Sequence, residues 1–95
     1  MKWYKCFITG ENFPGELVDQ DYSVGFYTTR FVQAESEEAA ELVGLDLLRT
    51  EDRLQLPEGV MPSESARVYF EEIMEVGESD VPEIQAGFVF FEMES

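Results

Sequence analysis

The chain contains no histidine, one cysteine and only six lysine and arginine residues among 95. The absence of histidine excludes the Ser/His/Asp and Cys/His systems that activate a nucleophile, and it leaves no Cys/His spacing for a metal. Cys6 lies in a run of strand-forming residues, where a buried structural thiol is expected. We therefore predict no catalytic residue, no metal and no cofactor, and we expect that the protein is not an enzyme.

Long apolar runs are also missing. No stretch approaches the roughly 18 apolar residues of a membrane span. The chain reaches Gly10, Glu11 and Asn12 before the apolar region of a signal peptide can develop. A cysteine with no partner in its chain is typical of a reducing compartment. We expect a cytoplasmic protein of a bacterium, with no membrane partner.

Positive charge is scarce. The chain has 21 Asp and Glu residues against six Lys and Arg residues, which gives a formal net charge of −15 at pH 7. Binding to a phosphate backbone depends on Lys and Arg that displace condensed counterions, so nucleic acid is not an expected partner. The acid excess favours a basic protein partner through long-range attraction.

Aromatic residues are abundant. The chain has eight Phe, four Tyr and one Trp within a hydrophobic content of 44%. A chain with this content is expected to fold despite its charge. At 95 residues it forms a single domain, residues 1–95, with a modest core.

Segments rich in β-branched and aromatic residues predict four strands. They cover residues 3–9, 24–33, 66–76 and 87–93. Ser36 is a candidate N-cap, so a helix is expected from Glu37 to Leu48 or Arg49. Residues 11–23 predict a loop with a type II turn at its proline and glycine. The order ββαββ indicates an α+β domain, with a four-stranded, mainly antiparallel sheet and one helix packed on one face.

The apolar residues of the predicted helix do not share a single face. The face expected against the sheet consists of Ala39, Ala40, Val43 and Leu47, with Gly44 at its edge. Leu42 and Leu45 point elsewhere. Either the apolar stripe is wide, or residues 52–65 fold back over these leucines, or they form a subunit contact.

Two of the charged residues within predicted strands call for an explanation. Strict alternation in the third strand would place Glu72 on the same face as Phe70 and Met74. Glu72 is therefore either a buried acid or the sign of a bulge at Glu71-Glu72, and the bulge is preferred because an unpaired buried carboxylate is costly. Arg30, in the second strand, is expected to pair with a carboxylate on a neighbouring strand.

Apolar residues occupy both faces of every predicted strand. A sheet with one wet face alternates between apolar and polar residues, so this pattern indicates that the second face is covered. We expect a homodimer formed through that face or along an edge strand; the alternative is that the loops at 11–23 and 52–65 fold across it. The residues predicted to make this contact are Tyr27, Phe31 and Tyr69 on the sheet, with Leu42 and Leu45 on the helix.

An acidic group without any Lys or Arg spans the end of the third strand and the turn after it. It consists of Glu71, Glu72, Glu75, Glu78, Asp80 and Glu83. These carboxylates either serve solubility alone or form a docking surface for a basic partner.

Two segments carry a resemblance. Gly-Glu-Asn-Phe-Pro-Gly-Glu at 10–16 and Gly-Phe-Tyr-Thr-Thr-Arg-Phe-Val at 25–32 resemble a family of small bacterial proteins with no established activity. That resemblance implies no residue roles. The junction at 34–40 also resembles the strand-to-helix junction of small antitoxins of the HicB type, although the rest of the chain lacks their DNA-binding segment.

These observations favour one function and leave one alternative. We expect a small acidic interaction domain that acts as an inhibitor or immunity-type protein for a basic partner. The alternative is a small-molecule-binding module that uses the aromatic sheet face. A deep pocket lined by Tyr27, Phe31 and Tyr69 would favour that alternative, and a flat face would favour assembly.

Overall fold

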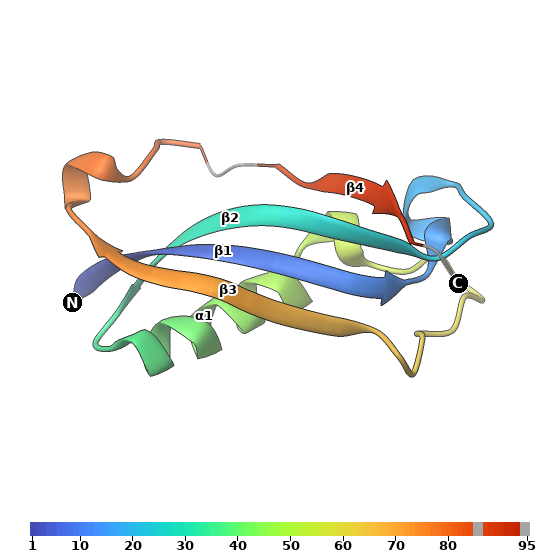
Figure 1. The fold of residues 1–95 in the computed structure, drawn as a ribbon, viewed down its shortest axis with the longest axis horizontal. Helices are drawn as coiled ribbons and strands as arrows, with labels where there is room; N and C mark the ends of the chain where they lie inside the picture. Colours follow the sequence, from blue (N-terminus) through green and yellow to red (C-terminus); the bar gives the residue numbers. More distant parts are fainter. Residues whose placement is uncertain (85–86, 94–95) are drawn as a thin grey trace.

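The computed structural model describes residues 1–84 and 87–93, which form a four-stranded antiparallel sheet with one helix packed on one side (Figure 1). The elements are β1 (Lys2–Phe13), β2 (Val24–Ala34), α1 (Glu37–Arg49), β3 (Arg67–Val76) and β4 (Val89–Glu92), with short 3₁₀ helices η1 (Gly15–Val18), η2 (Asp52–Leu54) and η3 (Glu78–Asp80). The predicted α+β class and the order ββαββ are confirmed.

The strand order across the sheet is β3-β1-β2-β4, and every pairing is antiparallel. Because β2 and β3 both pair with β1, they run in the same direction, and α1 connects them across one face. β3 and β4 form opposite edges, so the chain between them passes around one end of the sheet (Figure 1).

The first strand is longer than predicted. β1 continues to Phe13, so the prediction of a loop from residue 11 is wrong for its first three residues. The predicted type II turn is also absent, because Gly15 begins η1 after Pro14 at the N-cap. A Cβ atom at Gly15 would lie 1.9 Å from the Tyr22 carbonyl oxygen. This glycine is needed for a close backbone approach, not for a turn conformation.

Helix α1 begins as expected, with the Ser36 hydroxyl accepting a hydrogen bond from the Ala39 amide at 3.1 Å. The buried residues of the helix are Ala40, Gly44 and Leu48. Two residues of the predicted buried face are in fact exposed: Val43 is 39% exposed and Leu47 is 43% exposed. A Cβ atom at Gly44 would lie 2.7 Å from the Phe70 ring, so the small residues Ala40 and Gly44 let the helix approach the sheet.

The core lies between α1 and the sheet face that it covers. This covered face includes the fully buried Cys6 and Ile8 of β1 and Phe26 of β2. The Phe26 ring packs against three other rings with centroids 5.2 to 6.1 Å away. It also lies over Gly10 of the neighbouring strand, where a Cβ atom would fall 2.0 Å from the ring.

The predicted bulge in the third strand is confirmed. Phe7 pairs with Glu72 and Ile8 pairs with Phe70, which leaves Glu71 as the extra residue. The bulge moves Glu72 out of the covered face and brings Ile73 into the core, where it packs partly buried. The strand thereby avoids a buried carboxylate.

Candidate interaction surface

The sheet face turned away from α1, here the open face, carries most of the aromatic residues that the core does not use. The pairing register gives its members on each strand. They are Trp3, Lys5, Phe7, Thr9 and Glu11 on β1; Gly25, Tyr27, Thr29, Phe31 and Gln33 on β2; Arg67, Tyr69, Glu72, Met74 and Val76 on β3; and Val89 and Phe91 on β4.

Three rings form a row across the open face. Phe7 stacks on Tyr27 with ring centroids 5.9 Å apart, and Tyr27 packs on Phe91 at 4.8 Å. Phe91 lies over Gly25, where a Cβ atom would fall 2.4 Å from its ring. Rings from three adjacent strands thus form a continuous apolar surface, and such cross-strand aromatic pairs also stabilise the sheet.

A second tyrosine widens this surface. Thr9 pairs with Tyr27 on one side and with Tyr69 on the other, and it is only 8% exposed. The register thus places a tyrosine on each side of the buried threonine, and both tyrosines remain in contact with solvent. Tyr27 and Tyr69 are 44% and 45% exposed.

Within the described residues, the open face is not covered by the rest of the chain. Besides the two tyrosines, Phe7, Met74 and Val89 on this face are between 39% and 64% exposed. The segment around η2 packs on the helix side, where Leu54 contacts the core cluster. Because Phe7, Tyr27, Tyr69, Met74 and Val89 are exposed, the alternative in which the loops at 11–23 and 52–65 cover the second face does not hold at these positions. The apolar residues that the sequence predicted on the second sheet face are therefore partly exposed to solvent.

The charges on the open face balance. The register places Lys5 and Arg67 there with Glu11 and Glu72, two cations and two carboxylates, on a chain whose formal net charge is −15. Lys5 lies centrally, opposite Phe31 on one side and Met74 on the other. Between the described residues, neither Lys5 nor Glu72 forms an ion pair. The open face is a nearly neutral surface on an acidic molecule.

The structure separates the predicted contact residues into two layers. Tyr27, Phe31 and Tyr69 share the open face. Leu42 is 68% exposed on α1, and Leu45 of the same helix lines a cavity on the helix side. The two leucines cannot contribute to a contact made by the open face, because they belong to the opposite layer.

The six carboxylates of the predicted acidic group do not form one continuous surface, because they lie on both faces of the sheet and in η3. Glu72 lies on the open face, whereas Glu75 is on the covered side, 3.6 Å from the Lys2 ammonium. Glu78 and Asp80 lie in η3, and an Asp80 carboxylate oxygen accepts a hydrogen bond from the Gly77 amide at 3.1 Å. The remaining members, Glu71 and Glu83, are exposed at the bulge and after η3.

Arg30 is a buried cation on the covered face, 6% exposed. Its guanidinium lies 3.4 Å from the Glu51 carboxylate and 4.9 Å from the Phe88 ring centroid. Burial lowers the pKa of the Arg30 guanidinium, while Glu51 opposes that shift and Arg53 adds to it.

The sequence correctly predicted a carboxylate partner for Arg30 and placed that carboxylate wrongly. Glu51 comes from the connection between α1 and η2, not from a neighbouring strand. β4 pairs with β2 only from Val24 to Tyr27, so it does not extend alongside Arg30. The Arg30 side chain lies on the face that α1 covers, where it can reach Glu51 in the segment that follows the helix.

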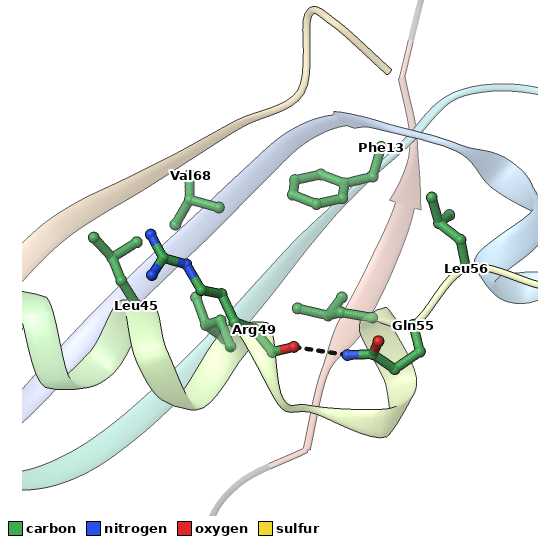
Figure 2. Close-up of a pocket in the computed structure, with 8 residues that line it drawn as sticks. Phe13, Leu45, Arg49, Gln55, Leu56 and Val68 are labelled. Carbon is green, nitrogen blue, oxygen red and sulfur yellow. Dashed lines mark hydrogen bonds between the residues drawn. The ribbon is translucent and has the colours of Figure 1, made fainter. Parts of the chain in front are cut away.

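A cavity of about 530 Å³ opens on the helix side, between the end of α1, η2 and the ends of β1 and β3 (Figure 2). It is lined by Phe13, Leu45, Leu48, Arg49, Leu54, Gln55, Leu56 and Val68. The Gln55 amide closes one side by donating a hydrogen bond to the Arg49 carbonyl at 2.8 Å. Sequence reasoning missed this cavity; its one signal was the pair of leucines at 54 and 56 in a region rich in proline and glycine.

Comparisons of the chain with family models, curated proteins and solved structures found no match. In residues 1–84 and 87–93, no helix has the length and apolar character needed to cross a membrane. The same residues contain no group of three or more Cys, Asp or Glu side chains that could hold a metal ion.

Proposed function

We propose that this protein is a protein-interaction domain without catalytic activity and that its open face is the contact surface. The observation that carries the proposal is the row Phe7–Tyr27–Phe91, which is continuous across three strands and partly exposed. Large exposed apolar patches on small proteins mark interaction sites, and aromatic residues are enriched at their centres.

The shape of the open face supports a protein partner over a small molecule. Within residues 1–84 and 87–93, three cavities lie on the helix side, at the start of α1 and at the end of β4. Tyr27, Phe31 and Tyr69 line none of these three, and Phe91 of the aromatic row lines the one at the end of β4. Side chains that lie outside a cavity, as Tyr27 and Tyr69 lie outside these, enclose little of a small ligand, whereas a protein of similar size can cover them.

A small-molecule function remains a second candidate at a different place. The helix-side cavity of about 530 Å³ falls within the roughly 300 to 1,000 Å³ of ligand sites and has six apolar lining residues. Arg49 and Gln55 at its edge would orient a polar group of a ligand. An amphipathic molecule with one anionic group suits this lining.

The acid excess leads to a more specific proposal. Since the paired positions of the open face balance, the carboxylates that produce the −15 charge lie on the rest of the surface. That surface suits a basic partner, so we propose an inhibitor or immunity-type protein of the bacterial cytoplasm. The single buried thiol fits a reducing compartment. Binding to the basic partner should weaken steeply as salt increases.

Site-specific photo-cross-linking in cells tests the interaction proposal. Tyr27 on the open face, or Leu42 on α1 as the matched control, is replaced by the photoreactive residue p-benzoylphenylalanine; the two positions are 44% and 68% exposed. We expect protein adducts from position 27, which report the partner of the open face; adducts from position 42 would come from a basic partner on the acidic surface. Adducts from position 42 alone, or from neither position, would contradict the proposal.

A further inference from the structure

We infer that the open face is occupied by a second copy of this chain, face to face, with Lys5 of each protomer opposite Glu72 of the other. This inference rests on the proposed function, because it names the partner of the same surface. It also assigns the open face and the acidic remainder of the molecule to different partners.

The charge distribution selects a second copy over a basic partner at this face. A basic protein is attracted to a surface with excess carboxylates, but here Lys5 and Arg67 balance Glu11 and Glu72. A partner complementary to this surface is apolar at its centre and nearly neutral. The open face itself meets both conditions, and a two-fold contact brings the same patch of two copies together.

The positions of Lys5 and Glu72 make the face self-complementary. Lys5 pairs with Met74 and Glu72 pairs with Phe7, so the two charges are diagonal neighbours on adjacent strands. In the proposed dimer, the two-fold axis lies in the plane between the two facing sheets. In projection, it crosses the line from Lys5 to Glu72 at its midpoint and at a right angle. Each lysine then faces the glutamate of the other protomer. Two reciprocal ion pairs form, and neither charge is left buried alone.

The molecule offers enough area for such a contact. Its extents are 41 × 24 × 23 Å. A standard interface buries roughly 800 Å² on each partner, which corresponds to most of one long side of this molecule. Phe7 would lie near the two-fold axis beside Lys5 and Glu72, and the rest of the aromatic row would extend from it over β2 and β4. The polar side chains Thr29 and Gln33 would lie among the apolar residues.

Charge exchange tests this arrangement. In Lys5→Glu, the carboxylate introduced into each protomer would face Glu72 of its partner, and in Glu72→Lys, two ammonium groups would meet. We expect each variant alone to dimerise at least about tenfold more weakly than the unmodified protein, because like charges would be buried together. An equimolar mixture of the two variants should recover the affinity, because each contact in the mixed dimer joins one carboxylate to one ammonium group. Sedimentation equilibrium measures all three samples.

The covered side of the sheet provides matched controls. Lys2→Glu and Glu75→Lys make the same charge changes at an ion pair on the other face, 3.6 Å apart. Both controls should dimerise as the unmodified protein does, apart from the small effect of net charge. Circular dichroism checks that every variant is folded; Lys5 and Glu72 are exposed, so their exchange should leave the fold intact.

The outcomes separate this inference from the proposed function. A monomer at the highest attainable concentration in 0.5 M salt would overturn the inference, and so would a mixture that fails to recover affinity. Cross-links from position 27 to a different protein would then still support the interaction proposal. Dimer formation lost in each single variant and restored in the mixture supports the inference, because a merely structural role would not be restored by mixing.

Discussion

The two faces of this sheet are built from neighbouring residues, but they differ in what covers them. Phe26 and Tyr27 are adjacent in β2, yet Phe26 is 0% exposed beneath the helix layer and Tyr27 is 44% exposed on the open face. Both rings contact other rings across strands. The difference shows that aromatic packing alone does not bury a face. A second layer does, and in the part of the chain that the structure describes one α-helix, α1, supplies it.

The largest expected effect tests that difference directly. Phe26→Ala should lower the free energy of unfolding by about 3 to 5 kcal/mol, because it removes a fully buried ring and leaves a cavity. Tyr27→Ala should cost the monomer less than about 1.5 kcal/mol, since its ring is already partly in water, and should abolish dimerisation. Urea denaturation at low protein concentration measures both. Equal losses for the two variants would mean that the faces do not differ.

A second prediction concerns the charge beneath the helix layer. Arg30→Ala should destabilise the fold by about 3 kcal/mol, because it removes the partner of Glu51 and the contact with Phe88. The matched control is Arg49→Ala, whose side chain is 77% exposed and lies 4.0 Å from Asp46. It should cost no more than about 0.5 kcal/mol. Thermal denaturation compares the two; an Arg30 variant as stable as the control would show that the buried contacts are unimportant.

Cys6 on the covered face predicts a dependence on alkaline pH. Burial, together with the nearby charge of Glu41, raises the pKa of the Cys6 thiol from 9.0 to about 11. The unfolded chain would lose the proton near pH 9 while the folded protein keeps it. The stability that this group contributes is therefore complete below pH 9 and is lost as the pH rises from 9 to 11.

Urea denaturation between about pH 8 and 11 can isolate this contribution. Cys6→Ala should decline less steeply with pH than the unmodified protein, because only the unmodified chain carries the titrating thiol. In the native protein at the lower end of this range, a thiol reagent should react at the rate of unfolding. Immediate modification of Cys6 would show that the covered face is open to solvent.

The smallest expected effect is at the bulge. Deletion of Glu71 leaves Phe70 opposite Ile8 and Glu72 opposite Phe7 in a regular ladder. We expect a change of less than about 1 kcal/mol in the free energy of unfolding, because no side chain changes face. Deletion of Met74 should lower the free energy of unfolding much more, because every β3 side chain on one side of the deletion would move to the opposite face of the sheet. If the two deletions are equally damaging, the register of β3 is not the one described.

The sequence predicted most of the fold because its patterns are local. Strand-forming runs, the Ser36 cap and the conflict at Glu72 each depend on neighbouring residues, and the structure bears out the strands, the helix and the bulge. Alternation also indicated apolar residues on both sheet faces, and the exposed Tyr27 and Tyr69 agree with it.

The remaining features depend on contacts between distant residues. The helix packs closely at Gly44 because the Phe70 ring lies there, and helical periodicity cannot predict that contact. The Arg30–Glu51 pair joins residues 21 positions apart whose meeting depends on the path after α1. The helix-side cavity likewise requires the ends of two strands and a helix to meet, so the leucines at 54 and 56 alone could not reveal its other lining residues.

Trp3 gives the most direct test of what covers the open face. It is the only tryptophan in the chain and lies on that face, opposite Gln33 and Val76. Quenching of its fluorescence by acrylamide, a neutral molecule that the −15 charge does not repel, is measured as the protein is diluted. We predict that quenching is weak at high concentration and increases upon dilution, in step with dissociation of the dimer. Quenching that is strong and unchanged at every concentration would contradict the account, because it would show a face that stays wet.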